Sequence, residues 1–102
     1  MGTSRETPKY LAQKLLNIRR IIDGGLSQEE IVKRLGLESS IDRTYISKYE
    51  TGILEPPLRV LLRYADLAGV HLEVLADDEL ELPAKIPSSP KSVGVRKKPK
   101  KN

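Results

Sequence analysis

The sequence contains no cysteine, no phenylalanine and no tryptophan, and its only histidine is His71. Without cysteine the chain has no disulfide framework, no thiolate zinc site and no thiol redox motif. A single histidine cannot build a histidine-rich metal site or supply a second member of a catalytic pair. The sequence therefore predicts no metal site, and its core must consist mainly of leucine and isoleucine.

Long apolar runs are absent as well. No run approaches the ~20 residues of a membrane span, and the N-terminal residues lack the apolar stretch of an export signal. Serine, histidine and aspartate occur, but no arrangement of them suggests a nucleophile with its base. We expect the 102 residues to form one cytoplasmic domain that is not an enzyme. We also expect it to bind no cofactor, no membrane and no evident small-molecule ligand.

Charge is distributed unevenly along the chain. The whole sequence carries 18 basic and 14 acidic residues, a net charge of +4. Every acid precedes residue 84, whereas basic residues and prolines dominate the remainder. Residues 84–102 are therefore predicted to form a disordered basic tail, which either follows a phosphate backbone or stays solvated without a role. Such a tail alone is weak support for nucleic-acid binding.

Local signals divide the middle of the chain into four short helical segments. Thr7 followed by Pro8 is typical of a helix start, and Gly24 ends the apolar periodicity that follows. Ser27 and Glu30 form the capping box of a second helix. The apolar positions of the first segment recur at spacings of four, three and four: Leu11, Leu15, Ile18 and Ile22.

The third and fourth segments carry comparable signals. Asp42 is the predicted cap of a third helix over residues 43–51, which Gly52 stops in the left-handed conformation. The fourth helix starts after Pro57, because proline is tolerated at a helix start but not inside a helix. It ends at Gly69.

The periodicity changes after the fourth helix. Residues 71–74 and 79–82 alternate polar and apolar side chains, which favours short strands, although a fifth helical turn over 72–75 also fits. The apolar side chains of this stretch either complete the monomer core or contribute to a dimer interface: Leu72, Val74, Leu80 and Leu82.

These patterns predict an all-α fold, a compact bundle of four to five helices with a short C-terminal strand or hairpin extension. The chain divides into an N-terminal arm (1–7), a helical domain (8–70), a strand-like extension that is a possible dimerisation element (71–83), and the tail (84–102).

The third helix has two unlike faces. Its cations and hydroxyls fall on one arc of about 140°, with Tyr45 at the edge of that arc and Ile46 and Tyr49 opposite. An α-helix fits the major groove of DNA, where arginine pairs with guanine and hydroxyls meet base edges. A solvated face is the alternative, but the absence of acids favours DNA. The polar arc consists of Arg43, Thr44, Ser47, Lys48 and Thr51.

Two segments in this order resemble the helix-turn-helix family of phage repressors, Cro and xenobiotic-response-element regulators. They are residues 26–31 (LSQEEI) and 45–52 (YISKYETG), with Gly36 between them and residues 61–70 after them. The resemblance covers about residues 9–75. It implies a five-helix DNA-binding domain whose third helix enters the major groove, usually as a two-fold dimer on a palindromic operator.

The resemblance also assigns roles to single residues. It implies base or phosphate contacts from Gln28, Arg43, Thr44, Ser47 and Lys48, and the arc adds Tyr45 and Thr51 to the candidate DNA-binding set. The amide of Gln28, in the first turn of the second helix, can bind a phosphate.

A structural ion pair between Arg19 and Glu50 is implied as well. Glu50 lies beside Ile46 on the inward side of the third helix, and a partly buried carboxylate needs a cationic partner. Arg19 directly follows the buried Ile18, and Arg20 is the alternative partner.

The sequence departs from the family pattern in several places. The turn before the third helix is about four residues longer than usual and the loop after the first helix about two residues longer, which leaves the docking angle of the third helix open. Val32 replaces the usual alanine. After Gly52, Ile53 and Leu54 stand where basic residues are common, so these two side chains either cap the core or meet a partner.

We therefore expect a sequence-specific, double-stranded DNA-binding transcription regulator. A homodimeric repressor is preferred over an activator, because occluding polymerase requires no additional surface. The alternative is a protein-interaction module on the same scaffold, such as an antitoxin or a transcription-machinery adaptor.

Overall fold

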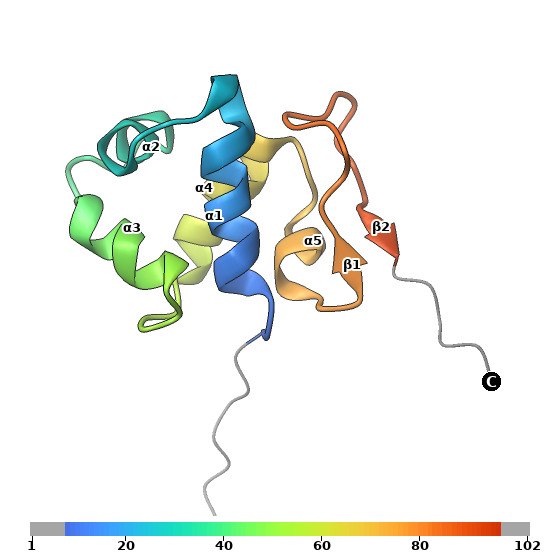
Figure 1. The fold of residues 1–102 in the computed structure, drawn as a ribbon, viewed down its shortest axis with the longest axis horizontal. Coiled ribbons are helices and arrows are strands. Elements are labelled where there is room, and N and C mark those ends of the chain that lie inside the picture. Colours follow the sequence, from blue (N-terminus) through green and yellow to red (C-terminus); the bar gives the residue numbers. More distant parts are fainter. Residues whose placement is uncertain (1–7, 97–102) are drawn as a thin grey trace, which may run out of the picture.

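The structure is a computed structural model and describes residues 8–96. Helix α1 runs through the middle of a mostly helical arrangement, with α2 and α3 at one end and the two strands at the other (Figure 1). The predicted fold class is confirmed. The elements are α1 (Leu11–Ile21), the 3₁₀ turn η1 (Ile22–Gly24), α2 (Gln28–Arg34), α3 (Arg43–Glu50), α4 (Leu58–Ala68), α5 (Leu72–Ala76), β1 (Leu80–Glu81) and β2 (Val95–Arg96).

Helix α1 begins later than predicted. Its first residue is Leu11 and its cap position is Tyr10, so the predicted start at Pro8 is wrong; the predicted cap, Thr7, lies outside the described residues. The backbone N–H groups of Lys9 and Tyr10 donate to the Asp78 carboxylate over 2.8 and 3.1 Å. These bonds hold the preceding chain against the α5–β1 turn and away from the helical path.

The starts and stops of α2, α3 and α4 agree with the sequence signals. The Ser27 hydroxyl accepts from the Glu30 N–H (3.0 Å) and the Glu30 carboxylate accepts from the Ser27 N–H (2.7 Å), so the capping box is confirmed. The Asp42 carboxylate accepts from the Thr44 N–H over 2.9 Å. Local capping bonds therefore define where α2 and α3 begin, whereas α4 follows Pro57 without a side-chain capping bond.

One core joins the five helices. It is built from leucine, isoleucine and valine, with two tyrosines and small residues of α4 filling the remaining space. The longest helices each bury one stripe against it. The side chains with no exposed surface at all include Leu15, Ile18, Ile22, Ile31, Ile46, Tyr64, Val70, Val74 and Leu75.

Residues 71–74 are not a strand. They open α5, which buries Val74 and Leu75 completely. An alternation over only four residues fits one helical turn as well as a strand, and packing against α1 and α4 selects the helix. Of the second alternating stretch, only Leu80 and Glu81 form a strand, which pairs antiparallel with Arg96 and Val95.

Residues 84–96, predicted to be disordered, pack instead against the α4–α5 turn. Ile86 is 7% exposed, and the Ser88 and Ser92 N–H groups donate to the carbonyls of Ala68 and Gly69 over 3.0 and 2.9 Å. Carbonyls at the end of a helix have no partner within the helix, and this segment supplies one. We call residues 84–96 the C-terminal strap. The remainder of the predicted tail, residues 97–102, lies outside the described residues.

Glycine is required where the strap crosses α4. Gly69 ends α4 in the left-handed conformation (φ 69°), and a Cβ atom there would collide with the backbone of Ser88. The same glycine therefore stops the helix and admits the strap.

None of the described helices is long and apolar enough to cross a membrane.

The Tyr64 hydroxyl is the one buried side-chain polar atom without a hydrogen-bond partner among the described residues. Burial, reinforced by the nearby Glu50 carboxylate, raises the pKa of Tyr64. An unpaired buried hydroxyl costs about 1–3 kcal/mol.

Tyr64→Phe is therefore expected to raise the free energy of unfolding by about 1 kcal/mol, measured by urea denaturation. Tyr45→Phe, at a 43% exposed side chain, is the control and leaves stability unchanged. A loss of stability in Tyr64→Phe alone would contradict this account.

Candidate nucleic-acid interface

Helix α3 is anchored by one apolar face. Ile46 has no exposed surface and Tyr49 is 3% exposed, and α3 contacts both α1 and α2. The ring of Tyr45 lies 6.3 Å from that of Tyr49, tilted by 42°. Burial raises the pKa of Tyr49. Because this face is fixed in the core, the opposite face of α3 must point outward.

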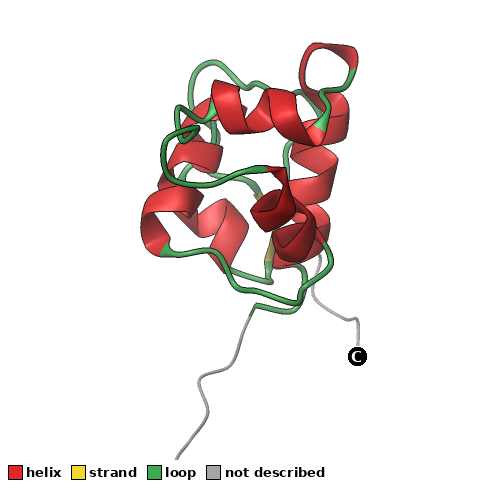
Figure 2. Cartoon of the chain, turned by 90° about the vertical axis from the view of Figure 1, so that its left-hand side faces the viewer, coloured by secondary structure: helices red, strands yellow, loops and turns green. Residues whose placement is uncertain are grey.

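The outward face of α3 carries the predicted polar arc. Arg43, Thr44, Lys48 and Thr51 are exposed, and Ser47 is half-buried. All residues of α3 are described, and none on this arc is acidic, because Glu50 turns inward. Seen from the α2–α3 end, this side of the molecule consists of helices and loops, with the strands behind them (Figure 2).

Thr51, at the C-terminal end of the arc, forms hydrogen bonds to the backbone of α3. The Thr51 hydroxyl donates to the Ser47 carbonyl over 2.9 Å and approaches that of Lys48 at 3.3 Å. Its hydrogen is therefore used within the helix, and its oxygen remains an acceptor.

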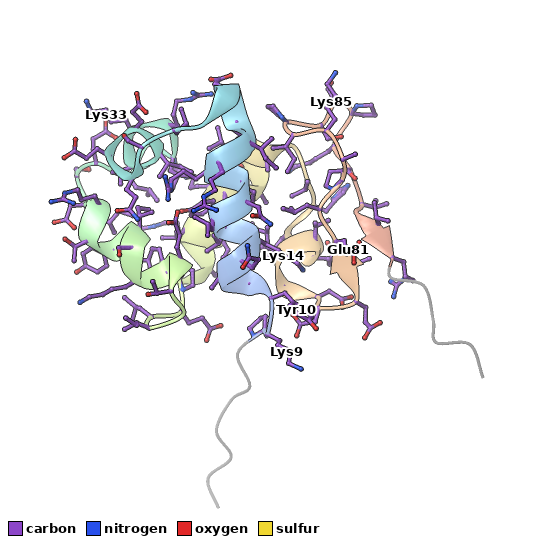
Figure 3. All side chains as sticks on the ribbon, viewed as in Figure 1. Lys9, Tyr10, Lys14, Lys33, Glu81 and Lys85 are labelled. Carbon is purple, nitrogen blue, oxygen red and sulfur yellow. The ribbon has the colours of Figure 1, made fainter. Side chains whose placement is uncertain are left out.

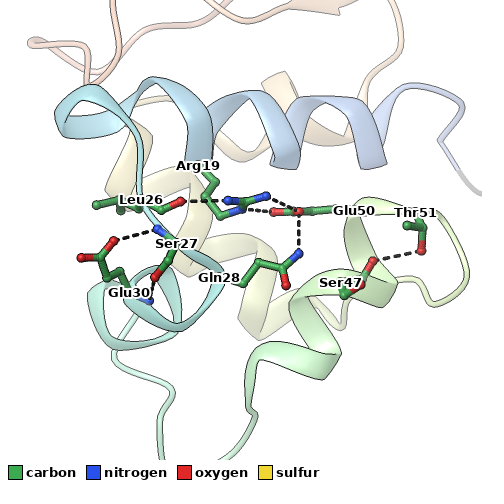
Figure 4. Close-up of polar contacts among 8 residues, drawn as sticks. All are labelled: Arg19, Leu26, Ser27, Gln28, Glu30, Ser47, Glu50 and Thr51. Atoms are coloured by element: carbon green, nitrogen blue, oxygen red, sulfur yellow. Dashed lines mark hydrogen bonds and ion pairs between the residues drawn. The ribbon is translucent and has the colours of Figure 1, made fainter.

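A partly buried ion pair holds α3 against α1. The Arg19 guanidinium donates from Nε and Nη2 to the two Glu50 oxygens over 2.6 and 2.9 Å, and from Nη1 to the Leu26 carbonyl over 2.8 Å (Figure 4). The hydrogen bond to Glu50 raises the pKa of Arg19. The side chain of Glu50 is only 5% exposed. Arg19, and not the alternative Arg20, which is exposed, is the partner of Glu50.

Gln28 joins this pair from α2. Its Nε2 donates to Glu50 Oε1 over 3.2 Å, a contact that sequence reasoning missed because it considered only DNA as the partner of Gln28. The amide nitrogen carries two hydrogens, so one binds Glu50 and the second is available for an outside acceptor. The ion pair and the first turn of α2 are thus one hydrogen-bonded unit.

The long turn between α2 and α3 folds back onto the core. Leu37 is 4% exposed, and its N–H donates to the Val32 carbonyl over 3.1 Å. Ile41 packs against the same core, and its N–H donates to the Leu37 carbonyl over 2.9 Å. From α4, Arg63 donates to the Leu35 carbonyl over 3.0 Å. The residues that make this turn longer than is usual in the family therefore belong to a turn that is anchored on the core.

Acidic side chains border the outward face at its N-terminal end, where Glu29, Glu38 and Asp42 line a hollow together with Arg43 and Thr44. Glu29, in the first turn of α2, lies 3.8 Å from the guanidinium of Arg43. The two side chains are 74% and 66% exposed, so their attraction is weak. Together with Ser27 and Gln28 they line one surface hollow of about 300 Å³.

Comparison with known proteins agrees with this geometry. A family of helix-turn-helix domains, HTH_3, matches residues 16–75. The chain belongs to the Cro/C1-type helix-turn-helix family. No curated protein and no solved structure matches the chain.

Membership of the helix-turn-helix family carries a general function. The matched range includes α2, α3 and α4 and most of α5. At the level of the family, the chain is a DNA-binding transcription regulator.

The described residues hold no group of three or more histidine, cysteine, aspartate or glutamate side chains placed to bind a metal ion.

The four residues considered for dimerisation lie in and next to α5 and β1, outside α3. Val74 is fully buried and Leu80 is 8% exposed, while Leu72 and Leu82 pack partly against the core. All four side chains belong to the monomer core or pack against it, as the first of the two interpretations of the alternation predicts. Val74 and Leu80 are therefore buried within one chain, whereas Leu72 and Leu82 keep part of their surface exposed.

Breaking the ion pair tests its structural role. Arg19→Leu leaves the Glu50 carboxylate buried without its cation and is expected to lower the free energy of unfolding by about 3 kcal/mol. Arg20→Leu removes the same charge from the neighbouring exposed position and is expected to change stability little. Thermal and urea denaturation measure both, and equal losses would contradict the pairing.

Proposed function

We propose that this protein is a sequence-specific, homodimeric repressor that reads the major groove of double-stranded DNA with α3. The observation that carries the proposal is the outward face of α3, where two cations and three hydroxyls lie exposed or half-exposed without an acid. The family match supports DNA binding. A helix fixed by its apolar face can present that arc to base edges without rearrangement.

Each residue of the arc suits a definite contact. Arg43 offers two donors to the acceptors of guanine, and Lys48 binds guanine or a phosphate. Thr44 offers a hydroxyl and a methyl group, the latter for thymine, while Ser47, Tyr45 and Thr51 add hydroxyls along the helix. The second amide hydrogen of Gln28 binds a phosphate. Phosphate contacts set the register, and base contacts set the sequence.

The mode of action follows from the proposed dimer. A dimer with two copies of α3 reads two half-sites about 34 Å apart, one turn of DNA. Such a palindromic operator overlapping a promoter excludes polymerase, and no ligand domain is needed for that effect.

Selection of random duplexes by the purified full chain tests the proposal. An enriched inverted repeat with half-sites one turn apart is the expected result. A single enriched half-site would retain DNA reading and overturn the dimer. No enrichment, with only salt-sensitive weak binding, would favour the protein-interaction module instead.

Alanine variants of the two cations test the reading helix. Arg43→Ala and Lys48→Ala are each expected to weaken operator binding by about tenfold or more, and Arg43→Ala also to relax the preference for one base. The control is Lys85→Ala, which removes the same charge on the side away from α2 and α3 (Figure 3). Fluorescence anisotropy at one salt concentration measures all three. Equal weakening would indicate a general charge effect.

Glu29, whose carboxylate lies near the Arg43 guanidinium, is expected to weaken DNA binding. Glu29→Gln removes a negative charge near the phosphates and releases Arg43, so affinity for all duplexes rises. If Arg43 then pairs with a phosphate, the salt dependence steepens by about 0.9 in log–log slope. The control is Glu73→Gln, on the exposed surface of α5. Affinity unchanged in Glu29→Gln would contradict this role.

A further inference from the structure

The long turn between α2 and α3 carries two serines whose polar side chains have no partner in the described part of the chain. Ser39 and Ser40 are both exposed. Their hydroxyls, and the backbone N–H of Ser39, form no hydrogen bond with any described residue. We call these two residues the turn tip. The turn tip thus offers three hydrogen-bond donors, two hydroxyls and one backbone N–H.

The turn tip has a fixed position. The N–H groups of Ser40 and Ile41 both donate to the Leu37 carbonyl over 2.9 Å. Leu37 is 4% exposed, and Ile41 packs against the same core on the other side of the tip. Because residues on both sides hold it, the tip can present its donors without first becoming ordered, which lowers the entropy cost of binding.

The turn tip lies beside the start of α3. Ser40 precedes Arg43 by three residues, which is at most about 11 Å of chain. The turn and α3 lie at the same end of the molecule (Figures 1 and 2). The major groove is only about 12 Å wide, so a helix lying in it has a sugar–phosphate backbone close on either side. An α3 that enters the groove therefore brings the turn tip to a backbone.

Neutral donors of this kind suit a phosphate. Serine hydroxyls and backbone N–H groups are common ligands of DNA phosphates and carry no base preference of their own. The acid of the turn, Glu38, lines a hollow of about 310 Å³ among α2, the turn and α3, and neither Ser39 nor Ser40 is among the walls of that hollow. The serines therefore occupy a different part of the turn surface from its carboxylate.

We propose that the turn tip binds an operator phosphate next to the base pairs that α3 reads, and thereby sets the angle at which α3 enters the groove. This inference rests on the proposed DNA-reading function and adds Ser39 and Ser40 to it as positioning residues. Gln28 lies at the start of α2 and the turn tip follows its end. The two phosphate contacts are thus separated by the length of α2, and two fixed points define a direction.

A charge placed at the tip tests its distance from the DNA. Ser39→Arg adds a cation at a position without backbone strain, because Asp23 is the only described residue other than glycine with a positive φ. The variant is expected to bind all duplexes more tightly, with a salt dependence steeper by about 0.9 in log–log slope for each bound chain. The matched control is Ser89→Arg, at an exposed serine of the C-terminal strap, which is expected to change neither. Equal gains in both variants, or no gain in Ser39→Arg, would overturn the proposal.

Removal of the hydroxyls tests the native contact. Ser39→Ala with Ser40→Ala is expected to weaken binding to the selected duplex about fivefold, and to weaken binding to its base-substituted variants by the same factor. The salt slope stays unchanged, because no charge is lost. Ser89→Ala is the control and leaves affinity unchanged. A changed base preference, or wild-type affinity in the double variant, would contradict a positioning role.

Neutral methylphosphonates, placed one at a time in the selected duplex, locate the phosphate. One substitution beside the base pairs read by α3 is expected to weaken wild-type binding and to have little further effect on the Ser39→Ala, Ser40→Ala variant. Equal effects of every substitution on the two proteins would overturn the contact.

Binding by the wild-type chain separates this inference from the function beneath it. If the wild-type chain selects a duplex while the turn variants behave like the strap variants, DNA reading stands and the contact of the turn tip is wrong. If the wild-type chain selects no duplex, the proposed function fails, and the phosphate contact fails with it.

Discussion

The arrangement of α1, α2 and α3 depends on the ion pair between Arg19 and Glu50. One guanidinium binds both oxygens of the carboxylate and the Leu26 carbonyl, and the same carboxylate accepts from Gln28. Helix α1, the entrance to α2 and the end of α3 are thereby joined at one point. A helix of eight residues, such as α3, is too short to be stable alone, so its direction is set by this point and by Ile46 and Tyr49.

The surface around α3 follows from this fixed orientation. Because Ile46, Tyr49 and Glu50 face the core, the remaining side chains form a polar arc directed outward. The chain then leaves α3 through Ile53 and Leu54, which stay exposed. The polar arc and the exposed loop after α3 therefore adjoin, and a hydrogen bond from Leu54 to the Lys48 carbonyl joins them.

The end of the domain away from α3 has a different basis. There the C-terminal strap supplies N–H donors to the carbonyls of Ala68 and Gly69, an apolar side chain, Ile86, and an exposed ion pair between Lys91 and Asp66. Exposed pairs contribute little, so the backbone bonds and the burial of Ile86 account for most of its attachment. The strap completes the core that the four predicted helices leave open.

The sequence by itself determined the elements whose signals are local. The capping bonds of Ser27, Glu30 and Asp42 and the glycine stops act within a few residues, and so α2, α3 and α4 were predictable, as was the polar arc of α3. Only the tertiary structure decided the rest. Four alternating residues fit a strand or a helix until α1 and α4 bury Val74 and Leu75. The strap has few apolar residues and is held by carbonyls at the end of a distant helix. Which leucines remain exposed likewise depends on what the whole core leaves uncovered, a property that no local pattern contains.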